Sequence, residues 1–196
     1  MAIVNSYTAD MPTPDRTSLD AIVLAACEIL EQDGVAGLTM NAVAHRVGVR
    51  PPSLYKRVES RDQLIRLVAE ATLTELAVRL DAVTSPQQLA NGFRAFGHER
   101  PAAFQLVMAP GAGMPVAGIE FGVAASASIL RVAGGLAGEA HALEAARTLT
   151  AWAAGFVGME LNGAFQLGGN VDDAWQFGVT HIVAAISMTG PDPLVE

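Results

Sequence analysis

Apolar side chains recur every three or four residues along most of the chain, which predicts a protein built from amphipathic helices. Between Ser18 and Asp33 the apolar positions form one stripe, with Ser18 as the N-cap and Gly34 as the C-terminal stop. A second, shorter helix follows the cap residue Thr39 and ends before Gly48. No segment alternates apolar and polar residues for long enough to predict a strand, so the predicted fold class is all-α.

Two more helices are predicted directly after the glycine turn. Pro51 and Pro52 cannot lie inside a helix but can open one, so a very short third helix is expected over Pro52–Val58. Ser60 and Gln63 form a capping box that begins a long fourth helix. A short helix, a glycine turn and a second short helix make a helix-turn-helix, the arrangement that places a helix in the major groove of DNA.

The remainder of the chain also reads as helical. Ser85, followed by Pro86, begins one helix, and Pro101 begins a short one. The segment Pro110–Pro115 contains too many prolines and glycines to be anything but a loop. Three longer helices are expected after it, over Val116–Gly134, Glu139–Leu167 and Asp172–Met188, the last of them capped by Asp172.

Composition allows a large core and argues against a membrane protein. Hydrophobic residues make up 51% of the chain and charged residues 16%. The longest charge-free stretch, between Arg100 and Glu120, is broken by prolines and glycines, so we do not expect it to span a membrane. The N-terminal residues resemble no signal peptide, and the single cysteine, Cys27, cannot form an internal disulfide. These features predict a cytoplasmic protein.

Positive charge is concentrated in the predicted helix-turn-helix. The net charge of the chain is −8, yet the segment His45–Arg66 holds six basic residues against two acidic ones. Arginine and lysine on the outer face of a short helix suit the phosphates of DNA. A solvated helical hairpin that carries basic residues without binding DNA remains the alternative interpretation.

One stretch of this region resembles a known family. Residues 37–64 read GLTMNAVAHRVGVRPPSLYKRVESRDQL, which is similar to the DNA-binding signature of the TetR family of transcriptional repressors, and the similarity extends over about Thr17–Val68. The matching features are the Leu-Thr pair before the second helix, the Val-Gly-Val turn, the Leu-Tyr pair and a basic residue at the start of the fourth helix. Many members have Phe in place of Val58 and Lys in place of Arg61, but both replacements keep the chemistry of the position.

The resemblance implies which side chains touch DNA. Phosphates would be bound by Thr39, Tyr55, Lys56 and Arg61, with Arg57 on the same outward basic face. The side chains nearest the bases would be Arg50, Pro51, Pro52 and Ser53, and Asn41 matches a position that can also reach a base. Because two of these residues are prolines, fewer direct hydrogen bonds to bases are expected than is usual.

A weaker resemblance covers the C-terminal half. Residues 147–165 resemble the penultimate helix of a C-terminal domain common in this family, although Ala154 stands where members often have His before Gly155. The family resemblance implies a homodimer built on this helix and the last one, and two copies about 34–36 Å apart could read a palindromic operator. Glycines cost a helix about 1 kcal/mol each relative to alanine, so the many small residues here imply close packing, either with a second subunit or within one.

Aromatic and sulfur-containing side chains gather in the C-terminal half, where they could line a cavity for a small apolar or weakly polar effector. The predicted lining residues are Phe93, Phe96, Phe104, Met108, Phe121, Trp152, Phe156 and Met159. Residues of this kind at helical spacing also make an ordinary core, so both interpretations stay open. Effector binding would move the fourth helix and change the spacing of the two DNA-binding units.

Nothing in the sequence favours an enzyme, a metal site or a cofactor. His141 and Glu144 lie one helical turn apart but form too small a set for a metal, and Cys27 has no patterned histidine partner. We therefore predict a ligand-responsive regulator, most simply a repressor, with a tail over 1–16, a DNA-binding domain over 17–63 and an effector and dimerisation domain over 64–190. The alternative is a helical small-molecule-binding protein that has lost its DNA function.

Overall fold

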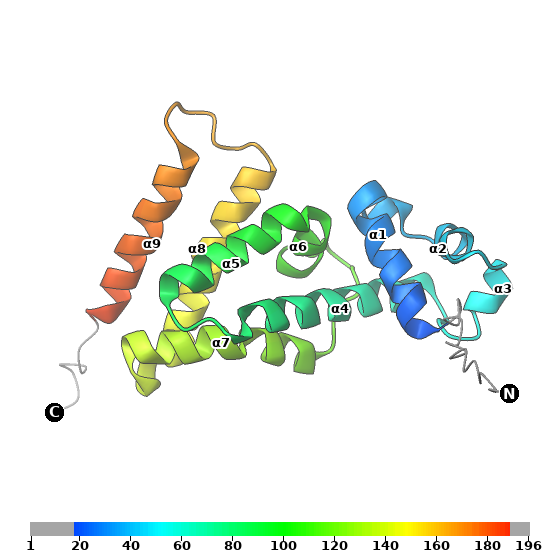
Figure 1. Ribbon diagram of the computed structural model, residues 1–196, viewed down its shortest axis with the longest axis horizontal. Helices are drawn as coiled ribbons and strands as arrows, with labels where there is room; N and C mark the ends of the chain where they lie inside the picture. The colour runs from blue at the N-terminus through cyan, green and yellow to red at the C-terminus, as the bar shows by residue number, and fades with distance from the viewer. Residues whose placement is uncertain (1–17, 189–196) are drawn as a thin grey trace, which may run out of the picture.

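The computed structural model describes residues 18–188, and every regular element in that part of the chain is a helix, which confirms the all-α prediction. The elements are α1 (Leu19–Gly37), α2 (Met40–Val47), α3 (Pro51–Leu54), α4 (Arg61–Asp81), α5 (Pro86–Glu99), α6 (Pro101–Met108), α7 (Ile119–Ala137), the 3-10 helix η1 (Glu139–His141), α8 (Ala142–Leu161) and α9 (Val171–Ser187). Helices α1, α2 and α3 lie at one end of an elongated molecule, and α8 and α9 form a hairpin towards the other (Figure 1). The predicted tail lies outside the described residues.

Hydroxyl side chains begin four of the helices where the sequence predicts them. The hydroxyl of Ser18 accepts a hydrogen bond from the backbone N–H of Ala21, and Thr39, Ser60 and Ser85 cap α2, α4 and α5 in the same way. The side chain of Gln63 accepts a hydrogen bond from the N–H of Glu59 rather than from that of the N-cap Ser60, so the reciprocal bond of the predicted capping box is shifted by one residue.

Several predicted helix boundaries differ from the structure. Gly34 adopts φ 66°, which kinks α1, but helical turns continue to Gly37. Helix α3 is regular only over Pro51–Leu54, and hydrogen-bonded turns carry the chain on to Val58. Helix α7 starts three residues later than predicted, at Ile119, and ends three residues later as well.

The turn between α8 and α9 corrects two further predictions. Helix α8 ends at Leu161, well before Leu167, because Gly163 adopts the left-handed conformation with φ 61°. The predicted cap of the last helix is wrong. Asn170 is the N-cap, and its Oδ1 accepts a hydrogen bond from the N–H of Asp172 at 2.8 Å, so Asp172 lies inside the first turn.

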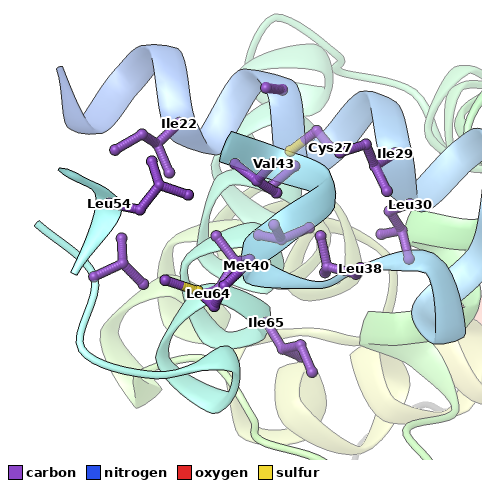
Figure 2. Packing of buried hydrophobic residues seen from close by; sticks show 14 of the residues in the cluster. Ile22, Cys27, Ile29, Leu30, Leu38, Met40, Val43, Leu54, Leu64 and Ile65 are labelled. Carbon is purple, nitrogen blue, oxygen red and sulfur yellow. The ribbon is translucent and has the colours of Figure 1, made fainter. Parts of the chain in front are cut away.

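Two hydrophobic clusters hold the molecule together. The first, which we call the head core, joins α1, α2 and α3 to the start of α4 and includes Ile22, Val43 and Leu54 (Figure 2). The second, the distal core, joins α5, α7, α8 and α9 and contains the fully buried Trp175 and Phe96.

Helices α4 and α6 belong to both cores. Helix α4 places Leu64 and Ile65 in the head core and Leu76 in the distal core, about three turns further along. Helix α6 places Leu106 in the head core and Phe104 in the distal core. A boundary at residues 63/64 stays a prediction, since the buried contacts cross it.

Helix α7 is mostly apolar, with Glu120 and Arg131 as its only charged residues. It has 19 residues and a mean hydropathy of 1.3, so among the described helices it alone is long and apolar enough to cross a membrane. It packs against α4 and α8 instead, and a third of it is buried. Its outward face nevertheless leaves Ile119 84% exposed and Val123 63% exposed.

Candidate nucleic-acid interface

Backbone geometry fixes the angle between α2 and α3. Gly48 takes the left-handed conformation with φ 74°, and the N–H of Val49 donates to the carbonyl of Ala44 at 2.9 Å, which closes the end of α2. Leu54 and Val58 are completely buried in the head core. Because these two residues anchor α3 from below, its opposite face points into solvent.

The ten predicted DNA-contacting residues are all at least partly accessible to solvent. Six are exposed, namely Asn41, Arg50, Pro52, Tyr55, Lys56 and Arg57, and four are half-buried, namely Thr39, Pro51, Ser53 and Arg61. The Tyr55 side chain is 54% exposed although it is large and partly apolar. An exposed tyrosine beside cations is suited to a phosphate backbone, to which its hydroxyl can donate.

Thr39 combines a structural role with a free donor. Its Oγ1 accepts a hydrogen bond from the N–H of Ala42 at 3.1 Å, so its own hydroxyl proton remains available. The start of α2 also carries the partial positive charge of a helix N-terminus. This end of α2 can therefore receive a phosphate oxygen.

Arg46 and Arg61 hold neighbouring segments of the head together. Arg46 donates to Glu28 at 2.9 Å and to Gln32 at 2.7 Å, which fastens α2 to α1. Arg61 donates to the carbonyls of Leu38 at 2.8 Å and of Val35 at 2.6 Å, which closes the end of α1. A phosphate contact by Arg61 stays a prediction, and the structure adds a stabilising role that the sequence did not suggest.

The other basic side chains supply the outward charge. Arg50, Lys56 and Arg66 are exposed and make no ion pair with any residue between 18 and 188, and Arg57 is exposed as well. Arg50, Lys56 and Arg66 are therefore available to pair with a polyanion such as the phosphate backbone of DNA.

The predicted effector residues divide between packed core and open cavities. Phe96 and Phe104 are fully buried, and Phe93 meets Phe104 edge-to-face at 5.3 Å. Phe93 and Trp152 border a void of about 30 Å³, which is the space of a single water molecule. In this conformation those aromatic rings therefore fill the distal core.

The remaining predicted effector residues lie elsewhere. Phe156 packs against both Trp152 and Trp175, and Met159 is 45% exposed. Met108 lines a cavity of about 520 Å³, and Phe121 lines a groove of about 430 Å³ beside α1 and α4. Effector contact by these eight residues stays a prediction.

One charged cluster, built around Glu31 and Arg100, was not expected from the sequence. The carboxylate of Glu31 in α1 accepts the N–H groups of Ala102 and Ala103, at 3.1 and 3.0 Å, and so caps α6. Arg100 bridges Glu31 and Glu75, at 3.4 Å to each. The partners are dozens of residues apart in the chain, so no local pattern signals them.

Within residues 18–188 no group of three potential metal-binding side chains comes together. Cys27 is buried in the head core, and burial raises the pKa of its thiol, which keeps it protonated and unreactive. The surface features of the molecule are therefore the cationic face of the head and the cavities of the distal half.

Comparison with known proteins matches both halves of the chain. Residues 22–68 match the description "Bacterial regulatory proteins, tetR family", and residues 87–182 match "Tetracyclin repressor-like, C-terminal domain". The HTH-type transcriptional regulator Rv0681 of Mycobacterium tuberculosis is 30% identical over 162 residues, which cover 76% of this chain and 73% of that protein.

Two further similarities concern the tetracycline repressors. The class C tetracycline repressor of Escherichia coli is 38% identical over 55 residues, which cover 28% of this chain and 25% of that protein. The crystal structure of a TetR variant from Acinetobacter baumannii AYE, in complex with minocycline, superposes with a TM-score of 0.65 at 22% identity and covers 89% of this chain and 99% of that one. The first similarity concerns sequence, and the second shows a shared fold.

Proposed function

The chain belongs to the TetR family of bacterial transcriptional regulators, and on that premise we propose that it is a cytoplasmic repressor that binds a palindromic operator as a homodimer and responds to a small ligand. The observation that carries the proposal is the exposed pair Arg50 and Lys56, which make no ion pair with any residue of 18–188 and lie on a turn that Leu54 and Val58 anchor in the head core. Relatives with this architecture are named transcriptional regulators, and the family is one of DNA-binding proteins without enzymatic activity.

The α8–α9 hairpin supports a dimer. Methyl groups added at Gly155 or Gly158 would meet nothing within 4 Å, so these two glycines are not explained by close packing inside the subunit. Gly178 is different, because a Cβ there would lie 2.3 Å from Trp152. On α9, Phe177 is 65% exposed and stacks on His181. A partner subunit would account for the open glycines and for the exposed aromatic ring.

The two helices shared between the cores support a ligand response. A ligand that moves the distal part of α4 or the Phe104 side of α6 would also move side chains packed in the head core. Such a shift requires the ligand to bind one conformation more tightly than the other. The complex of the Acinetobacter protein with minocycline shows that a protein of this fold takes a small molecule.

Selection from a pool of random duplex DNA tests the DNA part of the proposal. We expect recovered sites to be palindromic, with half-sites one helical turn apart or a multiple of it. Changing Lys56→Met should weaken binding to a recovered site about tenfold and lower the slope of log affinity against log salt by about one, because one phosphate contact is lost. Failure of the unaltered protein to retard any duplex at low salt would overturn the proposal.

Arg147→Met is the matched control, since it removes one exposed cation from the distal half of the molecule. It should leave both the affinity and the salt slope unchanged when no ligand is present. An equal loss in both variants would mean that overall charge, rather than the face of α3, governs DNA binding.

A further inference from the structure

Two open cavities lie next to each other along α7. The first, of about 480 Å³, is bounded by α4, α6, the loop before α7, α7 itself and the start of α8, and the second, of about 520 Å³, by α6, α7 and α8. They share three lining residues, Ser126, Leu130 and Leu143. We call the two together the α7 groove.

The α7 groove is apolar with a single charge at one end. No charged side chain lines the first cavity, whose walls include Leu73, Leu106 and Val123. In the second cavity the one charged lining residue is Arg147. Arg147 is exposed and makes no hydrogen bond or ion pair with any described residue, although the chain carries a net charge of −8.

The dimensions suit a chain-like ligand. Eleven residues of α7 separate Ile119, in the first cavity, from Leu130, which borders both, and they span about 16 Å at 1.5 Å per residue. Each cavity falls within the range of roughly 300–1,000 Å³ that small-molecule sites occupy. An extended alkyl chain could lie along the aliphatic wall with its polar end in the second cavity.

We propose that the α7 groove binds an aliphatic carboxylate of medium chain length, with its alkyl chain along α7 and its carboxylate paired with Arg147. A guanidinium holds a carboxylate through two parallel hydrogen bonds, and a single arginine neutralises a single negative charge. The hydroxyls of Ser126 and Thr150 also line the second cavity and can donate to the same head group. This inference rests on the proposed function, because it names the class of effector, and it replaces the uncharged effector expected from the sequence.

Two other occupants fit less well. A second copy of the chain packed groove to groove would bury Arg147 against apolar walls without an acidic partner, which is costly. A bilayer surface would receive the exposed apolar face of α7, but an acidic protein is repelled by anionic lipid. The experiment below gives a different result for each of these two occupants.

Binding of dodecanoate, dodecanol and dodecyltrimethylammonium to the full chain tests the proposal by calorimetric titration below their aggregation concentrations. We expect one dodecanoate per chain, bound about tenfold more tightly than dodecanol, and weaker binding still of the cationic probe. Arg147→Gln should abolish the preference for dodecanoate while leaving dodecanol binding unchanged, and Arg147→Lys should keep most of it. Equal affinity for dodecanoate and dodecanol, or an unchanged preference in Arg147→Gln, would overturn the proposal.

Two control variants separate the groove from the surface in general. Ser126→Trp, which fills the groove, should weaken dodecanoate and dodecanol alike, whereas Arg66→Gln, which removes a cation from α4, should weaken neither. Many probe molecules per chain, uptake only on vesicles, or cross-linking of Val123 in the first cavity to a second copy would each count against a carboxylate site. Operator binding without probe is measured separately on the same samples, so a failure of the DNA proposal shows as lost retardation with probe binding intact.

Discussion

At the scale of single residues, a cluster of charged side chains in the distal half joins three helices. Arg94 in α5 donates through Nε and Nη2 to Glu160 in α8, at 2.9 and 2.5 Å, and through Nη2 to Asp172 in α9 at 2.7 Å. His98 lies 3.1 Å from the same Glu160 carboxylate, whose side chain is only 7% exposed. Burial alone would raise the pKa of Glu160, but the hydrogen bonds from Arg94 and His98 outweigh it and lower the pKa.

We predict that Glu160→Gln lowers the free energy of unfolding at neutral pH by about 2 kcal/mol, because charge-assisted hydrogen bonds to Arg94 are lost. A carboxyl whose pKa is lowered by folding stabilises the protein above its ordinary pKa of 4.5 and loses that contribution as the pH falls below it. The difference between the two proteins should therefore shrink in acid. Urea unfolding at a series of pH values measures it.

Asp172→Asn provides the comparison, because the Asp172 side chain is 71% exposed and its pairing with Arg94 is screened by solvent. We expect Asp172→Asn to lower the free energy of unfolding much less than Glu160→Gln does. If the free energy of unfolding of Glu160→Gln stayed below that of the wild type by the same amount from neutral pH into acid, the stabilising role given to the ionised Glu160 would be wrong.

At this scale, hydrogen bonds between residues close together in the chain could be predicted from the sequence, and those between distant residues could not. The caps Ser18, Thr39 and Ser60 each bond to an N–H three residues away, so the pattern contains both partners. Arg61 bonds to carbonyls 23 and 26 residues away, and Asp172 to an arginine 78 residues away. Nothing in the neighbourhood of either residue reveals such partners.

At the scale of elements, α6 is the short link between the two cores. Pro101 at its first turn has no N–H, and the next two N–H groups are satisfied by Glu31 of α1. One face of α6 places Leu106 in the head core, and the other places Phe104 in the distal core. Any displacement of α6 must therefore either carry α1 with it or break the contact with Glu31.

We predict that Glu31→Gln speeds hydrogen exchange at the amides of Ala102 and Ala103 about tenfold, because the charge that favours the helix N-terminus and pairs with Arg100 is removed. Exchange measured by NMR tests the prediction. Glu28→Gln on the same helix breaks the ion pair with Arg46 and should leave both amides unchanged. Equal rates in wild type and Glu31→Gln would mean that Glu31 does not hold α6.

Element boundaries were predicted best where a proline or hydroxyl begins a helix. The starts of α4, α5 and α6 lie where Ser60, Ser85 and Pro101 place them. The end of α8 was placed six residues too late, because the apolar pattern continues through Phe165 while the backbone turns at Gly163. Periodicity reports which side chains could be buried, and it cannot report where a left-handed glycine stops the helix.

At the scale of the molecule, the sequence predicted a cationic head and a helical distal part, and the structure adds how they are joined. The sharing of α4 and α6 depends on packing between segments far apart in the chain, which no periodicity contains. The α7 groove could not be predicted from the sequence for the same reason. Its walls come from four helices and are mostly aliphatic rather than aromatic. Except for Phe121, the aromatic residues predicted to line a cavity fill the distal core around Trp175.

The open glycines of the distal half give the sharpest test of the proposed dimer. Gly155 on α8 and Gly135 on α7 are both exposed, and a Cβ added at either meets nothing within 4 Å in the subunit. For an isolated subunit, changing either glycine to leucine should stabilise its helix by somewhat under about 1 kcal/mol. In a dimer packed on α8, leucine at Gly155 would intrude on the partner and cost about 1–3 kcal/mol instead.

We therefore predict opposite signs for the two variants. Gly135→Leu should raise the free energy of unfolding at every protein concentration, whereas Gly155→Leu should weaken self-association in sedimentation equilibrium and, through it, operator binding. Leucine has a higher helix propensity than glycine at both positions, so both changes should stabilise an isolated subunit. A loss of stability at Gly155 would therefore point to contact with a second subunit. If both variants stabilise the protein and self-association is unaltered, the exposed face of α8 lies outside the interface, and the two DNA-binding heads must be joined by another surface.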